Sequence, residues 1–414
     1  MRQRRYLFLQ GCTGPFFAQL CDELRRAGHA VHRINFNTGD RVSWRGRPAC
    51  AYRGGIDDWP AFIADYITHQ GITDGVMLGD TRAIHRMAIA VMDRHAVRAH
   101  VLEEGYFRPS WLTLEASGIN GHSRLPADPD WYRDAAQHVP HYGDRPPIPS
   151  PLRRLAAYEI GYRIPNILDP LLHPGFVYHR EPAVREFYGW ARRFAKMPRL
   201  ERQAASRIQA LVGAGTPFFL LPLQLASDSQ MREHSDFHGI PSLVQRVINS
   251  FIRHAPADAS LVIKNHPLDT GFVDYRRWIN RLARRLGLAD RIIYLEAGHM
   301  PTLLDHAQGV VTVNSTVGAS ALLYRQPVIA LGEAIYDLPG LTFQGGLDAF
   351  WQDAEPPDRS LYRAFRDTVI HTTQVEGGFY SPRGIRMGVT GCAAIMQRDQ
   401  LPLDALMERT HGRG

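Results

Sequence analysis

The chain has 414 residues, enough for two or three domains, and its 44% hydrophobic and 21% charged residues exclude a wholly disordered protein. No apolar run approaches the ~18 residues of a transmembrane helix, and the N-terminal run Tyr6–Leu9 is too short for a secretory signal. The net charge of +7 is scattered along the chain, which favours an anionic ligand or an anionic membrane surface, and we find no nucleic-acid-binding motif.

The first 105 residues alternate between strand-like and helix-like patterns. Strands are predicted at 6–10, 30–36, 75–78 and 99–102, and helices at 16–27, 59–70 and 81–95. This alternation is typical of a parallel sheet that helices cover on both faces. Residues 120–151, rich in Pro, Asp, His and Tyr, are predicted to form a long irregular connection, and 152–207 to be mainly helical with breaks at prolines.

A second alternation follows, with strands predicted at 218–221, 261–264, 292–295, 310–313 and 328–331. Helices are predicted at 243–254, 275–286, 301–306 and from 316, and in the tail near 360–373 and 391–397. We therefore predict an α/β fold of two Rossmann-like domains, 1–207 and 208–345, that face each other across a cleft. A helical tail, 346–414, is expected to pack back on the first domain. Ligands of such sheets bind beyond the carboxyl ends of the strands.

Two adjacent carboxylates, Glu103 and Glu104, follow the strand at 99–102. At a strand end they can serve as a general acid, a general base or a nucleophile, and their pKa values depend on each other and on burial. Arg108 is close enough in sequence to hold one of them. The structural alternative is a solvated pair that caps the following turn.

Two polar motifs follow strands of the second block. Lys264-Asn265-His266-Pro267 gathers donors suited to a phosphate, and Asn314-Ser315-Thr316 begins a helix whose free N–H groups can bind one. The structural alternatives are a histidine satisfied in a turn and a simple helix cap. Gln224 could line the same cleft, and Asp40 closes a strand or loop end in the first block, although each alone is more often structural.

Lysine and cysteine usage add two observations. Only two of the 48 basic residues, Lys196 and Lys264, are lysines, so Lys264 could be needed as a compact positive charge. The four cysteines have no C-x-x-C spacing, and no histidine pattern completes a zinc site. We therefore expect reduced thiols and no metal.

Several short motifs occur in a specific order along nearly the whole chain. They are Gln10-Gly11, Gly14-Pro15-Phe16-Phe17, Arg33–Asn37 with Gly39-Asp40, Glu103–Tyr106 with Arg108-Pro109, Asn120-Gly121-His122-Ser123, Pro222-Leu223-Gln224, Asp228-Ser229-Gln230, Lys264–Asp269, Asn314–Gly318, Leu341-Thr342 and Gly377–Ser381. In this order the sequence resembles the KpsS/LipB-type capsule polysaccharide proteins, a family of β-Kdo glycosyltransferases.

The resemblance implies a GT-B architecture, CMP-Kdo as the donor on the side of 208–345, and lyso-phosphatidylglycerol or a related glycerolipid as the acceptor on the side of 1–207. Donor and product both have β linkages, so two inversions and a carboxylate nucleophile are implied. By the resemblance, that nucleophile would be Glu104, and Glu103 would orient it, serve as the base, or take its place. No metal or other cofactor is implied, because CMP carries a single phosphate.

The resemblance also assigns roles to the remaining residues. His266 and Lys264 would stabilise the departing phosphate, which His266 could protonate. The donor phosphate and CMP would be bound by Lys264, Asn265, Pro267, Asn314, Ser315, Thr316 and Gln224. Contacts with Kdo or the acceptor would come from Gly14, Asp40, Arg108, Asn120 and His122. The expected location is the inner face of the cytoplasmic membrane. The expected partners include the capsule assembly machinery but no nucleic acid.

Two alternatives stay open at this stage. A GT-B-like nucleotide-sugar epimerase uses similar paired domains and carboxylates. A non-catalytic capsule assembly or export factor would bind lipid-linked capsule without chemistry. The first would turn over UDP-sugars, and the second would tolerate Glu104→Gln and His266→Ala.

Overall fold

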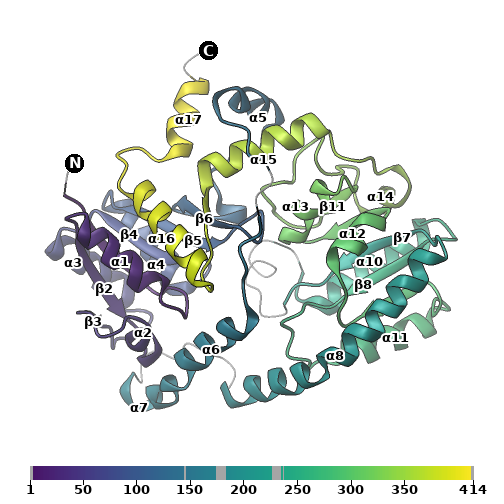
Figure 1. The fold of residues 1–414 in the computed structure, drawn as a ribbon, viewed down its shortest axis with the longest axis horizontal. Helices are drawn as coiled ribbons and strands as arrows, with labels where there is room; N and C mark the ends of the chain where they lie inside the picture. The colour runs from purple at the N-terminus through teal and green to yellow at the C-terminus, as the bar shows by residue number, and fades with distance from the viewer. Residues whose placement is uncertain (1–2, 144–145, 174–182, 226–234, 236, 412–414) are drawn as a thin grey trace. The chain divides into compact units, whose positions relative to one another are not determined.

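The computed structural model describes residues 3–143, 146–173, 183–225, 235 and 237–411 (Figure 1). The chain divides into two compact units. Unit 1 comprises Met1–Pro126, Asp134–Ala183 and Arg366–Gly414, and unit 2 comprises Ala127–Arg133 and Val184–Phe365. None of the helices in the described ranges is both long and apolar enough to cross a bilayer.

Seven strands form the sheet of unit 1, in the order β12-β6-β5-β4-β1-β2-β3. They are β1 (Arg5–Phe8), β2 (Ala30–Asn35), β3 (Cys50–Ala51), β4 (Asp74–Leu78), β5 (Arg98–Glu104), β6 (Trp111–Ala116) and β12 (Gln374–Glu376). Strands β1 to β5 are parallel, whereas β6 and β12 are antiparallel to their neighbours. The first strand lies inside the sheet: β2 and β3 are added on one side of β1, and β4 and β5 on the other, so the strand order reverses between β1 and β4.

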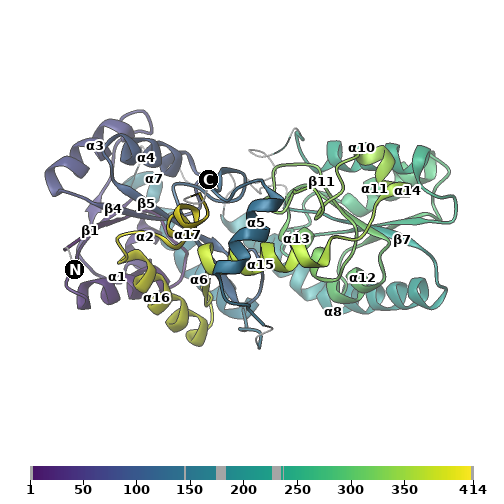
Figure 2. The same ribbon diagram turned by 90° about the horizontal axis from the view of Figure 1, so that it is seen from above.

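Helices cover both faces of this sheet. On one face, α1 (Phe16–Arg26) lies beside α16 (Pro382–Met396), and α3 (Trp59–Gln70) and α4 (Ala83–Arg94) cover the other (Figure 2). Because successive strand side chains point to opposite faces, Tyr6 and Phe8 pack under α1 and α16, and Leu7 under α3 and α4. The other helices of unit 1 are α2 (Thr38–Ser43), α6 (Leu152–Arg163), α7 (Asp169–Leu172) and α17 (Pro402–His411).

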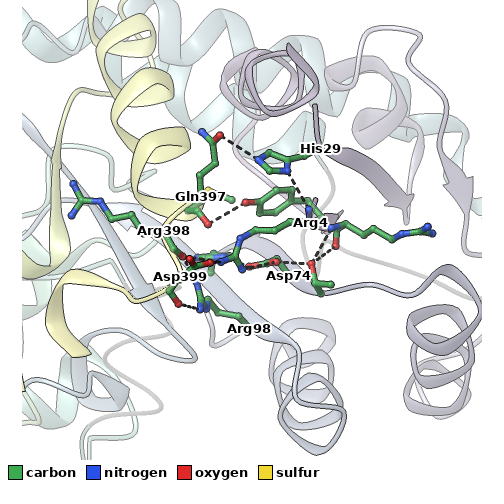
Figure 3. Close-up of polar contacts among 12 residues, drawn as sticks. Arg4, His29, Asp74, Arg98, Gln397, Arg398 and Asp399 are labelled. Atoms are coloured by element: carbon green, nitrogen blue, oxygen red, sulfur yellow. Dashed lines mark hydrogen bonds and ion pairs between the residues drawn. The ribbon is translucent and has the colours of Figure 1, made fainter. Parts of the chain in front are cut away.

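A partly buried polar network fastens the end of α16 to the amino ends of the strands (Figure 3). Asp74 at the start of β4 binds His100 Nε2 at 2.9 Å and Arg4 Nη1 at 3.4 Å. Arg4 and Arg98 also donate to the carbonyl of Arg398, just beyond α16, at 2.9 and 2.8 Å. Ligands of such sheets bind at the opposite, carboxyl ends, so this network is structural and holds the tail on unit 1.

Unit 2 is built on five parallel strands in the order β11-β10-β7-β8-β9. They are β7 (Phe218–Pro222), β8 (Ser260–Lys264), β9 (Ile292–Leu295), β10 (Gly309–Thr312) and β11 (Val328–Ala330). Its helices are α8 (Ala183–Gly213), α10 (Ile240–His254), α11 (Tyr275–Arg285), α12 (Met300–His306), α13 (Thr316–Leu323) and α14 (Leu347–Asp353). Unit boundaries fall inside α5 (Pro129–Ala135) and α15 (Arg359–Thr373), and after the first residue of α8.

The units differ from the predicted domain boundaries at three places. The first is Ala127–Arg133, which belongs to unit 2 although the prediction placed it in the first domain. Helix α8 falls in unit 2, because Ala204, Ile208 and Leu211 are buried there, whereas the prediction assigned residues up to 207 to the first domain. Residues 346–365 also belong to unit 2, since Phe350 and Trp351 of α14 pack into its core. Only the part of the predicted tail from 366 onward belongs to unit 1.

The two predicted parallel α/β blocks and the helical C-terminal segment are confirmed. Two expectations were wrong in detail. Strand β5 continues through Glu104, since Glu103 and Glu104 pair with Thr113 and Leu112 of β6, a strand that the pattern did not predict. The region 120–151 is not irregular throughout, because it contains a 3-10 helix at Asn120–His122 and α5.

Candidate active site

The two acidic residues end β5 at the carboxyl edge of the unit 1 sheet. Their side chains are partly exposed and, being consecutive in a strand, point to opposite faces. The turn after them needs a glycine, because a Cβ on Gly105 would lie 2.3 Å from the carbonyl oxygen of Trp111. The Glu-Glu-Gly sequence is therefore fixed in place by the β5–β6 pairing.

Glu103 lies on the side of α4. Its Oε1 accepts a hydrogen bond from the backbone N–H of Glu104 at 3.1 Å. Gly79, which follows β4 with φ of +68°, is so close that a Cβ there would lie 3.2 Å from Glu103 Oε2. Burial, with a smaller contribution from Glu104, raises the pKa of Glu103 to about 6, against the opposing charges of Arg108 and Arg82. Glu103 can therefore exchange a proton near neutral pH.

Glu104 lies on the opposite side, near Tyr380 of the Gly377–Ser381 motif, whose pKa is raised by burial and then by the charge of Glu104. Burial also raises the pKa of Glu104, and Arg108 opposes that shift. Among the described residues, the Glu104 carboxylate accepts no hydrogen bond, unlike that of Glu103. A desolvated carboxylate without such a partner is well suited to nucleophilic attack.

Asp40 has a different environment. Its buried carboxylate accepts hydrogen bonds from Phe36 N at 2.9 Å, Tyr162 Oη at 3.0 Å and Gln10 Nε2 at 3.2 Å, and Arg33 lies 3.5 Å away. These donors hold the loops after β1 and β2 together. The arrangement favours a structural role for Asp40 over the predicted contact with a ligand.

Asn120 and His122 lie together beyond the ends of β4 and β5. The backbone N–H of Asn120 donates to Tyr106 Oη at 2.8 Å, and His122 Nδ1 lies 3.0 Å from buried Asp80. The His122 side chain is half exposed. Gly14 lies elsewhere, against the C-terminal motif, where a Cβ would be 3.5 Å from the carbonyl oxygen of Phe379.

His85 of α4 is a buried histidine beside the turn that follows β4. It is fully buried, and its Nδ1 lies 2.8 Å from the carbonyl oxygen of Gly79. Burial, with Arg82 nearby, lowers its pKa to about 3, so the folded protein binds fewer protons than the unfolded chain between pH 3 and 6.5. The resulting stability is present above pH 6.5 and falls as the pH drops, by up to about 1.4 kcal/mol per unit.

We expect His85→Asn, which keeps a donor for Gly79, to flatten the loss of thermal stability between pH 6.5 and 4. The measurement is the midpoint of thermal unfolding across that range. His69→Asn on the exposed side of α3 is the matched control and should unfold with the wild-type pH dependence. An unchanged slope in His85→Asn would contradict the assignment.

Lys264 ends β8 at the carboxyl edge of the unit 2 sheet and is only 6% exposed. Its Nζ donates to the carbonyl oxygen of Asn265 at 3.3 Å. Burial, and then the positive charge of Arg193, lowers its pKa to about 8. No acidic side chain among the described residues pairs with this ammonium. An unpaired buried cation is costly, so an anion bound beside Lys264 would stabilise it.

Contacts with Glu296 and Arg193 hold the loop that follows Lys264. Asn265 donates to Glu296 Oε2 at 3.1 Å and accepts from the backbone N–H of His266 at 2.8 Å. Arg193 of α8 donates to the carbonyl oxygens of His266 and Pro267 at 3.2 and 3.3 Å and pairs with Glu296 at 3.3 Å. The His266 ring remains partly exposed, and its Nδ1 accepts from Leu268 N.

Gln224 and Asn314 meet where the strand order of unit 2 reverses, between β7 and β10. Gln224 Nε2 donates to Asn314 Oδ1 at 2.9 Å. Ser315 caps α13, accepting from Val317 N at 3.2 Å, and the side chain of Thr316 is partly exposed in the first turn. The structure thus brings Lys264, His266, Gln224, Asn314, Ser315 and Thr316 to one edge of a sheet, the position at which α/β proteins bind ligands.

Three residues that support these loops were missed by the sequence analysis: Arg193, Glu296 and Tyr162. Glu296 directly follows a predicted strand, so the rule that found Lys264 could have found it. Arg193 and Tyr162 belong to helices far along the chain, and no local pattern marks them. The motif at 228–230 lies outside the described residues. Within the described ranges, no group of three or more His, Cys, Asp or Glu side chains is placed to hold a metal ion.

The chain is similar to proteins of capsule polysaccharide synthesis. The family described as capsule polysaccharide biosynthesis protein matches residues 73–380. The chain is 37% identical over 384 residues to the capsule polysaccharide modification protein LipB of Neisseria meningitidis serogroup B, covering 91% of both chains. It is 34% identical to the capsule polysaccharide export protein KpsS of Escherichia coli, covering 91% of this chain and 97% of KpsS. A solved structure of Thermosulfurimonas dismutans KpsC, beta Kdo 2,7 transferase, aligns with a TM-score of 0.44 and 13% identity, covering 95% of this chain and 100% of that one.

Proposed function

Because the chain belongs to the capsule polysaccharide biosynthesis protein family, we propose that it is a retaining β-Kdo transferase. It moves Kdo from CMP-Kdo to lyso-phosphatidylglycerol or a related glycerolipid and so begins the linker of a capsular polysaccharide. It acts at the inner face of the cytoplasmic membrane, beside the capsule assembly machinery. The observation that carries the proposal is the pair of glutamates at one strand end. The Glu103 carboxylate accepts a backbone hydrogen bond, whereas the Glu104 carboxylate accepts none from the described residues.

In the first step, the Glu104 carboxylate attacks the anomeric carbon of Kdo, and the bond from that carbon to the phosphate oxygen of CMP breaks. The electron pair of that bond leaves with CMP. Lys264 and the N-terminal turn of α13, with Ser315 and Thr316, neutralise the phosphate, and His266 can protonate it. The products of this step are CMP and Kdo esterified to Glu104.

In the second step, the acceptor hydroxyl attacks the same carbon and releases Glu104. The proton of the acceptor hydroxyl passes to Glu103, whose pKa of about 6 suits a base at neutral pH. Two inversions leave the β configuration unchanged. The proposal involves no metal, because CMP carries one phosphate and Lys264 supplies a positive charge.

Incubation of the purified chain with CMP-Kdo and a short-chain lyso-phosphatidylglycerol should release CMP and give one product heavier by one Kdo. The reaction is followed by chromatography and mass spectrometry, with UDP-sugars in a parallel series. Turnover of a UDP-sugar alone would contradict the proposal and favour an epimerase. Binding of the lipid without any CMP release would favour a non-catalytic assembly or export factor.

A further inference from the structure

The surface of α6, α7 and the 3-10 turn Pro165–Leu168 between them carries aliphatic side chains on the outside of unit 1. Their exposed fractions range from 43% to 83% in the set Ile160, Ile164, Ile167, Leu168, Leu171 and Leu172. They follow one another from the last turn of α6, through its C-cap Ile164 and the 3-10 turn, to α7. We call this set the aliphatic stripe.

The opposite side of the same segment is polar and faces the protein. Tyr162 is buried and bonds to Asp40, and Asp169 accepts from the hydroxyl and backbone N–H of Thr38 at 2.6 and 3.0 Å. Asn166 accepts from the backbone N–H of Gly39. A surface helix of a globular protein normally turns its apolar stripe to the core and its polar face to water. Here the polar side faces the protein and the aliphatic side faces outward. Contact with an apolar environment outside the protein would therefore remove the aliphatic stripe from water and be favourable.

The charges around the stripe are positive. Arg153 and Arg154 are exposed at the start of α6, and Arg41 is exposed on α2, which packs against α6. The two acids of the segment do not offset them, because Asp169 bonds to Thr38 and Glu159 is engaged by Thr13 and Arg163. The outward surface therefore combines aliphatic groups with guanidinium groups.

We propose that the aliphatic stripe docks on an anionic lipid bilayer, with its side chains at the boundary between headgroups and acyl chains and the three arginines at lipid phosphates. Basic amphipathic segments bind membranes in this way, through buried apolar area and attraction to anionic lipid. A second copy of the chain is a poorer occupant, because a symmetric contact would bring arginines toward arginines. The inference concerns a surface and not the transfer reaction, so it stands whether or not the chain transfers Kdo.

The full-length chain should sediment with phosphatidylcholine vesicles that contain phosphatidylglycerol. We expect Ile164→Asp/Leu168→Asp/Leu171→Asp to lower the partition constant at least about tenfold, because each change moves a charge into the interface. The substituted side chains are exposed, so the thermal midpoint should stay that of the wild type. Val273→Asp, at a residue of unit 2 that is 54% exposed, is the matched control and should bind like the wild type.

Three results would overturn the proposal. They are a wild-type chain that does not bind these vesicles, a triple variant that binds them as tightly as the wild type, and a wild-type dimer that the triple variant dissociates while vesicle binding is unchanged. The last would assign the stripe to a second copy. The assay contains no sugar donor, so failure of the transferase proposal cannot produce any of them.

Discussion

Glu104→Gln is expected to lower kcat/KM for Kdo transfer by roughly 10³-fold or more, since an amide cannot replace a carboxylate nucleophile. The fold should tolerate the change. Burial already raises the pKa of Glu104, and the neutral amide has nearly the same size as the desolvated carboxylate. We therefore expect an unchanged thermal midpoint, which makes lost activity a measure of chemistry and not of unfolding.

The neighbouring acid provides the matched comparison. Glu103→Gln removes the proposed base and should cost about 10²–10⁴-fold. Because burial raises the pKa of Glu103 to about 6, wild-type kcat/KM should fall tenfold per pH unit below that value as the base becomes protonated. Glu103→Gln should lose this acid limb, whereas the residual activity of Glu104→Gln should keep it.

A trapped intermediate decides between the two acids. With CMP-Kdo and no acceptor, a rapid acid quench followed by peptide mass spectrometry should find Kdo on Glu104. An adduct on Glu103 would exchange the two roles. An adduct on neither residue, in an enzyme that still releases CMP, would contradict double displacement.

The sequence predicted those parts of the fold that depend on short-range patterns. Buried runs such as Val310–Val313 alternate with amphipathic helices, and these periods indicated β1, β2, β4, β5 and the five strands of unit 2 to within a few residues. The strand-end rule then selected Glu104, Lys264 and Asn314, because parallel strands bring their carboxyl ends to one edge. That the two edges act on one donor molecule remains a prediction.

The parts that the sequence could not predict depend on pairing across long stretches of chain. Strand β6 extends β5 through Glu104, and the short β12 pairs with β6 only because the chain returns to unit 1 after unit 2. Arg193 is one arginine among many until the fold places it against the His266 loop. Tyr162 is similar, since its bond to Asp40 links residues more than 100 positions apart.

Lys264→Met is expected to stabilise the folded protein while weakening donor binding. Burial holds the pKa of Lys264 near 8, well below its usual value, so at pH 7 the fold carries a desolvated ammonium that no described acid offsets. Replacing it with an apolar side chain of similar length should raise the free energy of unfolding by about 1–3 kcal/mol. The Kd for CMP should rise at least about tenfold, because a charge-assisted contact with phosphate is lost.

The pH dependence separates this explanation from a simple packing effect. The folded protein binds fewer protons than the unfolded chain between pH 8 and 10.5, so wild-type stability should rise with pH across that window, and Lys264→Met should lack the rise. CMP affinity should show the opposite trend, weakening in the wild type above about pH 8 as the ammonium deprotonates. Lys196→Met removes the other lysine of the chain, which is exposed on α8, and should change neither property. If Lys264→Met bound CMP as tightly as the wild type, the ammonium would not be part of the phosphate site. If that variant also gained stability, Lys264 would be only an uncompensated buried charge.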